Sequence, residues 1–372
     1  MKVIIAAAGT AGHINPGIAI ANKIKKEEKD SEIIFIGTDR GLENDLVPRA
    51  GYELKTIEAY GFSKRISVDN FKKILKTNKG FGTAKKIVKE FKPDIVIGTG
   101  GYICGAVVWA AKANKVPIIL HESNSFPGKA IKTMGKMANT VLVSFEDAKK
   151  RITTCKNVVL TGTPVKIKKQ DYSINKRLEI IKSMELSEVK PIVLVFGGSQ
   201  GAQKINEAII DIIKNRLNIN YQIIWATGPK QYEIIKEELN KSSINIERIE
   251  NTKIVPYIYN MEEVENVSDV IVARSGAMTI TEISNLGKPS ILIPLPNVSN
   301  DHQMYNAKVL EEIGAAEILL NDTLIGEELD ACIKKIVLDK DAMRKMGKNA
   351  LSISIKDADE MIYNEIKKLV KR

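Results

Sequence analysis

Short apolar runs alternate with longer amphipathic segments along the first half of the chain. Runs with the length of buried strands lie at 2–8, 32–39, 93–101, 116–122 and 140–144. Between them, segments such as IAIANKIKKEE at 18–28 repeat apolar residues at helical spacing. Strands that alternate with helices predict a parallel sheet covered by helices on both faces.

The same pattern restarts in the second half. After TGTPVKIKKQ at 161–170, a strand, a glycine loop and a helix follow one another in PIVLVFGGSQGAQKINEAIIDII at 191–213. The length of 372 residues also exceeds the usual size of one domain. We predict an α/β fold of two doubly wound Rossmann-like domains that face each other across a cleft, at 1–163 and 164–352. We expect the last helix, at about 353–372, to pack back on the first domain.

Four glycine-containing loops each follow a predicted strand directly. They are AAGTAGH (7–13), GTGGY (98–102), GGSQGA (197–202) and RSGAMTITE (274–282). Glycine lets backbone N–H groups approach a ligand, and the start of the next helix presents unpaired N–H groups to a phosphate. The loops therefore predict phosphorylated ligands at the carboxyl ends of the strands. The alternative is that glycine only allows strand and helix to pack tightly.

The first loop has a second interpretation as a dinucleotide-binding loop. It reads A-x-G-x-x-G, with Ala7 in place of the first glycine, and Asp39 ends the second strand where a ribose-binding acid would lie. An NAD-dependent enzyme is therefore an alternative. Against it, His13 follows the last glycine directly, and the equivalent loop at 197–202 has no role in a simple NAD-binding fold.

The charge of the chain predicts an anionic partner. The formal net charge is +11, and residues 64–92 carry ten Lys or Arg side chains against two acids, with apolar residues interleaved. We interpret 64–92 as a basic amphipathic surface for anionic lipid; an ordinary solvated helical face is the alternative. Aromatic residues are only 5% and no aromatic-rich strand motif occurs, so no nucleic acid is expected.

Cysteine usage and the apolar runs indicate the compartment. The three cysteines are odd in number and far apart, which predicts neither a disulfide framework nor a zinc site and fits a reducing cytoplasm: Cys104, Cys155 and Cys332. The apolar start is too short for a signal peptide. The uncharged run at 95–111 is too short to span a bilayer and is interrupted by GTGG.

Several polar residues are candidates for chemistry. The three histidines lie in or beside candidate loops: His13, His121 and His302. HESN at 121–124 follows a strand, and the carboxylate of Glu282 could accept hydrogen bonds from two ribose hydroxyls. A purely structural role is the alternative for each. Two D-x-D sequences, at 339–341 and 357–359, lie in a charged helical region, so we expect surface or capping roles and no bound metal.

Seven motifs follow one another along the whole chain, in the order GTAGHINPG, GTGGYICG, HESN, TGTPVK, FGGSQGA, ARSGAMTITEI and DHQMYNA. Together they closely resemble the peptidoglycan N-acetylglucosaminyltransferases, the MurG family of the GT-B fold. The resemblance implies transfer of GlcNAc from UDP-GlcNAc to undecaprenyl-pyrophosphoryl-MurNAc-pentapeptide, with inversion and without a cofactor or metal. The enzyme would be peripheral, on the cytoplasmic face of the membrane. A GT-B enzyme with another lipid acceptor, such as diacylglycerol, is the alternative.

The resemblance also implies roles for single residues. In the second domain, Ile258 would contact uracil through its backbone, Glu282 would bind the ribose and Gln303 the GlcNAc hydroxyls. The other donor-binding residues that it implies are Lys166, Ser199, Ala277, Met278, Thr279 and His302. In the first domain, the residues implied for the acceptor and its sugars are Thr10, Ala11, Gly12, His13, Gly100, Gly101, Tyr102 and Asn124.

The chain departs from the family's pattern at some of these positions. Alanines at 7, 8 and 11 replace glycines, which would cost about 1 kcal/mol or more wherever φ is positive. Lys166 replaces an arginine, and Ser123 and His302 replace glutamines. We hypothesise that His13 is the general base, because imidazole exchanges protons near neutral pH. Glu122 is the second candidate, or it orients neighbouring groups.

Overall fold

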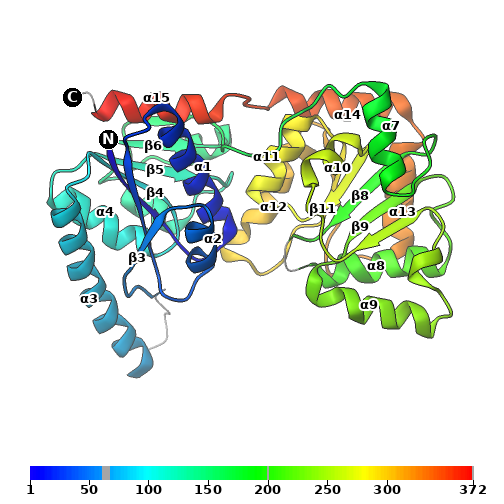
Figure 1. The fold of residues 1–372 in the computed structure, drawn as a ribbon, viewed down its shortest axis with the longest axis horizontal. Helices are drawn as coiled ribbons and strands as arrows, with labels where there is room; N and C mark the ends of the chain where they lie inside the picture. The colour runs from blue at the N-terminus through cyan, green and yellow to red at the C-terminus, as the bar shows by residue number, and fades with distance from the viewer. Residues whose placement is uncertain (61–67, 199–200, 371–372) are drawn as a thin grey trace. The chain divides into compact units, whose positions relative to one another are not determined.

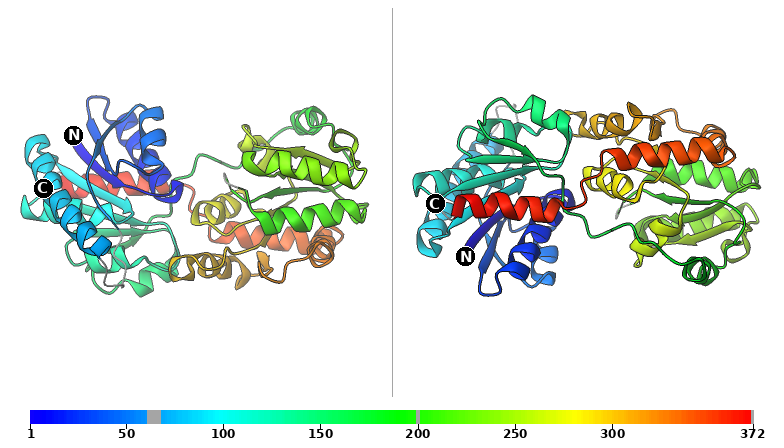
Figure 2. Two further views of the ribbon diagram at one scale, coloured as in Figure 1. Left: turned by 90° about the horizontal axis from the view of Figure 1, so that it is seen from below. Right: turned by 90° about the horizontal axis from the view of Figure 1, so that it is seen from above.

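The structure is a computed structural model that describes residues 1–60, 68–198 and 201–370, without the side chains of 68–76, 78 and 299. The chain divides into two compact units: unit 1 is Met1–Val165 with Ile355–Arg372, and unit 2 is Lys166–Ser354 (Figure 1). Each unit contains one parallel sheet with helices on both faces (Figure 2). The predicted doubly wound α/β fold is confirmed.

Unit 1 has a seven-stranded parallel sheet in the order β3-β2-β1-β4-β5-β6-β7. Its strands are β1 (Lys2–Ala7), β2 (Glu32–Gly37), β3 (Glu53–Thr56), β4 (Ile95–Gly100), β5 (Ile118–Glu122), β6 (Thr140–Val143) and β7 (Val158–Leu160). Its helices are α1 (Ala11–Glu27), α2 (Glu43–Arg49), α3 (Val68–Phe91), α4 (Ile103–Ala113), α5 (Lys129–Met134), α6 (Glu146–Arg151) and α15 (Ala358–Val370).

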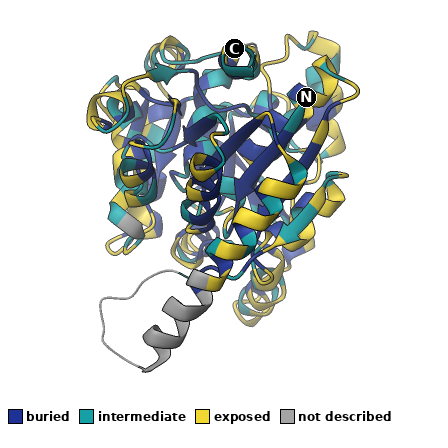
Figure 3. Cartoon of the chain, turned by 90° about the vertical axis from the view of Figure 1, so that its left-hand side faces the viewer, coloured by how far each residue is buried: buried dark blue, intermediate teal, exposed yellow. Residues whose placement is uncertain are grey.

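Alternate residues of β1 enter two hydrophobic cores on the two faces of this sheet. Val3 and Ile5 belong to the core that also contains residues of α1 and α15, whereas Ile4 and Ala6 belong to the core with α4. Figure 3 shows the central strands of this sheet as buried and the outer faces of the helices as exposed. Each fully buried Val or Ile contributes about 1.5–3 kcal/mol.

The last helix, α15, completes one face of the unit 1 sheet (Figure 2). Ile362 and Ile366 are buried in the core with α1. At the rim, Lys367 Nζ donates to Glu28 Oε1 at 2.6 Å, and Lys23 Nζ donates to Glu360 Oε2 at 2.5 Å. A segment from the end of the chain is therefore part of the first unit.

Unit 2 has a six-stranded parallel sheet in the order β10-β9-β8-β11-β12-β13. Its strands are β8 (Ile192–Phe196), β9 (Gln222–Ala226), β10 (Thr252–Val255), β11 (Val270–Ala273), β12 (Ser290–Leu292) and β13 (Ala316–Ile318). Its helices are α7 (Ile174–Ser183), α8 (Gln203–Lys214), α9 (Pro229–Lys241), α10 (Met261–Val267), α11 (Ala277–Leu286), α12 (His302–Glu311), α13 (Gly326–Val337) and α14 (Lys340–Ser352). Within the described part of the chain, no helix has the length and apolarity needed to cross a membrane.

The strand order of each sheet reverses at one point. The reversal lies between β1 and β4 in unit 1, and between β8 and β11 in unit 2. In open α/β sheets, ligands bind beyond the carboxyl ends of the strands at such switch points. The four loops singled out in the sequence are the four loops that follow these strands, so each unit presents a pair of them at its switch point.

Candidate functional site

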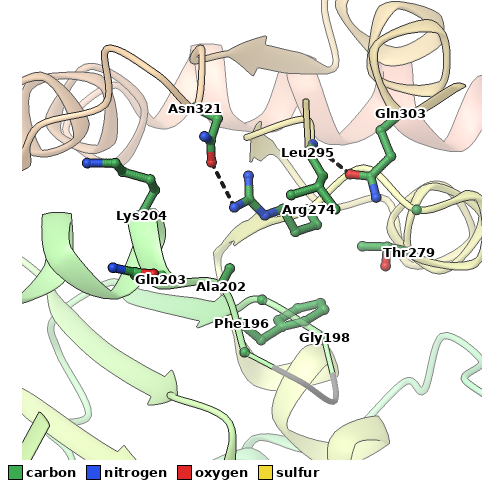
Figure 4. Close-up of a pocket in the computed structure, with 13 residues that line it drawn as sticks. Phe196, Gly198, Ala202, Gln203, Lys204, Arg274, Thr279, Leu295, Gln303 and Asn321 are labelled. Atoms are coloured by element: carbon green, nitrogen blue, oxygen red, sulfur yellow. Dashed lines mark hydrogen bonds between the residues drawn. The ribbon is translucent and has the colours of Figure 1, made fainter. Parts of the chain in front are cut away.

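The switch point of unit 2 opens on a pocket of about 570 Å³ (Figure 4). The glycines after β8 and the loop after β11 line it together, with Gly198, Gly201 and Gly276 among the lining residues. Gly198 and Gly201 have φ of +84° and +77°, a conformation that side chains rarely adopt. The backbone therefore favours glycine at these two positions.

Two helices of unit 2 begin at this pocket. Helix α8 starts at Gln203 after the N-cap Ala202, and α11 starts at Ala277 after the N-cap Gly276. In the described part of the chain, neither N-cap residue caps its helix with a side chain. Because the first N–H groups of a helix have no partner within it and lie at the positive end of its dipole, two such starts favour an anion.

Two cationic side chains line the same pocket (Figure 4). Arg274, directly after β11, donates to the Ile293 carbonyl at 3.0 Å and to Asn321 Oδ1 at 2.8 Å. Burial lowers the pKa of Arg274, but a guanidinium stays charged in proteins. Lys204, in the first turn of α8, forms an ion pair of 2.8 Å with Glu207 Oε2. The pocket combines backbone donors with positive charge, as a diphosphate requires.

Gln303 and Thr279 also line the pocket. Gln303 Oε1 accepts a hydrogen bond of 2.9 Å from the Leu295 N–H, and the Gln303 carbonyl accepts one of 2.8 Å from Ser275 Oγ. These bonds hold the start of α12 against the loops after β11 and β12.

Among the described residues, the other predicted donor residues are not part of the pocket lining, although α11 begins beside it. Ala277 and Met278 start α11, and His302 starts α12. Glu282 lies further along α11, Ile258 is buried between β10 and α10, and Lys166 is exposed. Ser199 lies outside the described residues.

The site residues predicted from the sequence did not include Arg274, Lys204 or Asn321. Arg274 had a usable signal, because it is a cation directly after a buried strand. Lys204 follows the glycine loop by only a few residues but resembles an ordinary helix residue. Asn321 had no signal in the sequence, because it contacts Arg274 from a loop 47 residues away.

Two carboxyl groups interact between α10 and α11: the buried Glu265 and the half-buried Glu282. Glu265, on α10, is 1% exposed, and among the described residues its Oε2 atom has no hydrogen-bond partner. Burial, and then the charge of Glu282, raise the pKa of Glu265; burial also raises that of Glu282. Lys288 Nζ donates to the carbonyls of Asn266 and Ser268, at 2.7 and 2.6 Å. Both carboxyl groups therefore resist ionisation.

In unit 1, the loop at 7–13 adopts a positive φ only at Gly9, where φ is +93°. Ala7 and Ala8 are buried in the two cores of the sheet, and Ala11 is the first residue of α1. The strain considered for alanine at 7, 8 and 11 therefore does not arise. Thr10 is the N-cap of α1, without a side-chain cap, so the helix start at Ala11 and Gly12 can donate to an anion.

The imidazole of His13 packs against the loop after β4. A Cβ atom at Gly100 would overlap the His13 ring, and one at Gly101 would lie 2.6 Å from the Ala8 carbonyl oxygen. Both glycines have positive φ. Glycine at these positions therefore allows the two loops of unit 1 to pack closely against each other. This is the packing role considered above for GTGG. Tyr102, next along this loop, is exposed.

One hydrogen bond fixes the tautomer of His13. Its Nδ1 atom lies 3.1 Å from the Ala8 carbonyl oxygen. A carbonyl only accepts, so Nδ1 must carry the proton, and Nε2 of the neutral ring is left with its lone pair. Thr99 Oγ1 donates to the His13 carbonyl at 2.7 Å and fixes the backbone.

The HESN segment is held together by its own hydrogen bonds. Glu122 Oε1 accepts from the N–H and side chain of Asn124, at 2.9 and 3.0 Å, and Oε2 accepts from the Gly128 N–H at 2.8 Å. This geometry favours the orienting role for Glu122 over that of a base. Burial lowers the pKa of His121 to about 4, and the ring bonds the Gly162 carbonyl, so His121 is a neutral structural residue.

The D-x-D sequence at 339–341 has the capping role expected of it. Asp339 Oδ1 accepts from the Asp341 and Ala342 N–H groups and caps α14. Among the residues that the structure describes, no three His, Cys, Asp or Glu side chains gather as metal ligands would.

Two family models match the chain. The N-terminal domain of glycosyltransferase family 28 matches residues 3–143, and its C-terminal domain matches residues 192–362. A relative from Thermoanaerobacter sp. (strain X514) is 43% identical over 369 residues, which are 99% of this chain and 100% of the relative. Its name is UDP-N-acetylglucosamine--N-acetylmuramyl-(pentapeptide) pyrophosphoryl-undecaprenol N-acetylglucosamine transferase. The chain belongs to the MurG family of glycosyltransferases.

Further similarities agree with this membership. A MurG relative from Clostridioides difficile (strain 630) is 41% identical over 99% of this chain and 89% of its own length. The crystal structure of Acinetobacter baumannii MurG is 25% identical, with a TM-score of 0.79 over 99% of each chain. A UDP-GlcNAc 2-epimerase from Neisseria meningitidis shares the fold alone, at 15% identity and a TM-score of 0.63 over 99% of this chain and 100% of its own. The motif order had therefore predicted the MurG family correctly.

Proposed function

We propose that this chain transfers GlcNAc from UDP-GlcNAc to the 4-hydroxyl of MurNAc in undecaprenyl-pyrophosphoryl-MurNAc-pentapeptide, a step of peptidoglycan synthesis. The observation that carries the proposal is the unit 2 pocket, where two uncapped helix starts, Arg274 and Lys204 surround a space suited to a nucleoside diphosphate. The full-length relatives carry the name of this transferase.

In the reaction, O4 of MurNAc forms a bond to C1 of GlcNAc while the bond from C1 to the β-phosphate oxygen breaks. UDP leaves with the electron pair, and the hydroxyl proton passes to Nε2 of His13. The helix starts and cations of the pocket offset the charge that develops on the diphosphate. Glu282 holds the ribose, the Ile258 backbone holds uracil and Gln303 contacts the GlcNAc hydroxyls.

The acceptor is assigned to unit 1. The start of α1, at Thr10, Ala11 and Gly12, receives its pyrophosphate, because that helix start has no side-chain cap. Asn124 lies near its sugars, oriented by Glu122. His13 then supplies the base beside the same loop.

Product formation tests this function. Labelled UDP-GlcNAc is incubated with a short-chain muramyl-pyrophosphoryl-lipid, and the expected product is the lipid-linked disaccharide. Activity on diacylglycerol instead of this acceptor would establish the alternative GT-B function. His13→Ala is expected to lower kcat by about 100-fold or more while UDP-GlcNAc affinity stays normal. A near-normal kcat would reject His13 as the base.

The membrane-facing surface of the enzyme is assigned to α3 and α4, and its location to the cytoplasmic face of the membrane. Lys79, Lys85, Lys86 and Lys89 are exposed on the described part of α3; residues 64–67 of the basic stretch lie outside the described residues. Trp109, on α4, is 43% exposed and packs against Phe81, with its ring 6.0 Å from Lys85 Nζ. Trp side chains beside Lys suit the boundary between lipid and water.

The chain offers a direct test of this surface, because its other tryptophan, Trp225, is fully buried. Brominated lipids in anionic vesicles are expected to quench Trp109 fluorescence, and salt is expected to reverse the quenching. Trp109→Phe is the control that removes the signal. Quenching that is indifferent to both lipid charge and salt would contradict the proposal.

A further inference from the structure

A glutamate with no assigned role, Glu43, lies beneath the first glycine loop. It is the first residue of α2 and is fully buried. Within the described ranges 1–60, 68–198 and 201–370, no Lys or Arg forms an ion pair with it. Gly37 and Gly41 provide the space for its side chain: a Cβ atom at Gly37 would lie 2.6 Å from Glu43 Cγ, and one at Gly41 would overlap the carboxylate.

Three neutral donors satisfy this carboxylate. Oε1 accepts from the Thr38 N–H at 2.8 Å and from Thr38 Oγ1 at 2.7 Å, and Oε2 accepts from the Gly9 N–H at 2.9 Å. Burial raises the pKa of Glu43, but the hydrogen bonds from Gly9 and Thr38 outweigh it and hold that pKa below its usual value. Glu43 is therefore a buried anion at neutral pH.

The bond to Gly9 has a consequence for His13, because the Gly9 N–H and the Ala8 carbonyl belong to one peptide group. A trans peptide is planar, with its N–H and C=O pointing in opposite directions. Glu43 accepts from one end of this group, and the other end accepts from His13 Nδ1 at 3.1 Å. The three groups form one continuous chain of hydrogen bonds from the carboxylate to the imidazole.

We propose that Glu43 is a positioning residue that acts through the Ala8–Gly9 peptide to hold His13 as the Nδ1–H tautomer, with Nε2 directed to the reaction. The carboxylate fixes the plane of the peptide and polarises its carbonyl, which makes that oxygen a stronger acceptor for Nδ1–H. An aspartate bonded to the catalytic histidine of serine proteases orients the ring and selects its tautomer in the same way. Here a backbone amide is interposed between carboxylate and ring.

The surroundings of this peptide fit the same role. Gly101 packs on the Ala8 carbonyl and Gly100 on the imidazole, so the loop after β4 encloses the His13 end of the chain of hydrogen bonds. Gly37 and Gly41 enclose the Glu43 end. Because Gly9 donates to Glu43, the phosphate-binding donors of the loop are those that follow it, at Thr10, Ala11 and Gly12.

The tautomer can be measured directly, because the chain contains only three histidines. In protein labelled with 15N-histidine, long-range 1H–15N spectra above pH 8 distinguish a protonated Nδ1 from a protonated Nε2, and loss of a signal in His13→Ala assigns it. We expect wild-type His13 to be the Nδ1–H tautomer. In Glu43→Gln the side chain loses the negative charge that polarises the Ala8–Gly9 peptide, and it also loses the Gly9 bond where its NH2 group faces the Gly9 N–H, so the Nε2–H tautomer should appear.

Two variants serve as controls. Thr38→Val removes a donor from Oε1 and leaves the Gly9 bond to Oε2, so its His13 tautomer should match the wild type. Glu43→Asp keeps the charge but is too short to reach Gly9, and it should behave as Glu43→Gln. Wild-type His13 in the Nε2–H form, or an unchanged Nδ1–H tautomer in either folded Glu43 variant, would overturn the proposal.

Kinetics separate this proposal from the assignment of His13 as base, on which it rests. Glu43→Gln is expected to lower kcat about 10-fold or more with the KM for UDP-GlcNAc unchanged, and to add no further loss in a His13→Ala background. Normal kcat in His13→Ala rejects the base, whatever the tautomer. Low kcat in His13→Ala with full kcat in folded Glu43→Gln rejects the role of Glu43 alone.

Discussion

The two units place equivalent glycine loops at equivalent switch points, but the polar groups of these loops are used differently. In unit 1, the Ala8–Gly9 peptide is bonded within the protein at both ends, between Glu43 and His13. In unit 2, the loops after β8 and β11 line a pocket of about 570 Å³ with two cations. The Ala8–Gly9 peptide of unit 1 is therefore bonded by the protein itself, whereas the equivalent loops of unit 2 line a pocket together with two cations.

The two units also treat buried carboxylates in opposite ways. Three hydrogen bonds outweigh the burial of Glu43 and lower its pKa, whereas burial raises the pKa of Glu265, whose Oε2 atom lacks a partner among the described residues. The number of donors, and not burial alone, decides whether a buried carboxyl group stays charged.

The largest effect is expected at the cationic pocket. Arg274→Ala removes a charged partner of the Ile293 carbonyl and Asn321, and one of the two cations that line the proposed diphosphate site. We expect kcat/KM for UDP-GlcNAc to fall about 100-fold, which corresponds to about 3 kcal/mol. Arg344→Ala is the control, because Arg344 is exposed and pairs with Asp341 on α14. If both variants bind UDP-GlcNAc alike, the pocket is not the donor site.

A smaller effect is expected from a substitution in the glycine loops of unit 1. It should lower kcat without changing the affinity of the donor pocket in unit 2. Gly100→Ala places a Cβ atom into the His13 ring and requires φ of +135° at an alanine. We expect kcat to fall about 10- to 100-fold while donor affinity, measured by calorimetry, stays unchanged. Gly105→Ala, on α4 with open space at its Cβ position, should be neutral. A weakened donor affinity in folded Gly100→Ala would break the division of roles between the units.

The smallest effect tests the two carboxylates through the pH dependence of stability. Because the folded pKa of Glu265 is raised above its ordinary 4.5, the wild type loses stability as pH rises through that range, and Glu265→Gln should remove this loss. The unfolding free energy of Glu265→Gln minus that of the wild type should increase by about 1–3 kcal/mol between pH 5 and 8. The measurement is denaturant unfolding at each pH.

Glu43→Gln provides the opposite sign in the same experiment. The folded pKa of Glu43 is lowered, so its charge stabilises the fold above the ordinary pKa and this stabilisation is lost as pH falls. The variant should therefore be less stable than the wild type at pH 7, with the difference shrinking toward acid pH. If the stability differences of the two variants from the wild type change with pH in the same direction, the contrast between Glu43 and Glu265 is wrong.

The sequence predicted the fold because strand and helix periodicities are local. It predicted the pairs of glycine loops because each directly follows a strand, and the order of motifs identified the family. Contacts between distant segments carried no such signal: Asn321 meets Arg274 across 47 residues, and Glu43 meets Gly9 across 34. Nothing in LENDLVP marks Glu43 as a buried carboxylate, because an acid in the first turn of a helix is ordinarily a surface residue.

The return of α15 to unit 1 has a consequence for synthesis. Unit 2 is encoded between Val165 and Ile355, and Ile362 and Ile366 complete a core of unit 1. During translation, all of unit 2 leaves the ribosome before the last helix of unit 1 does, so the second unit can fold while the first still exposes an apolar sheet face. A premature stop only some fifteen residues from the end would therefore damage the N-terminal half and spare its neighbour.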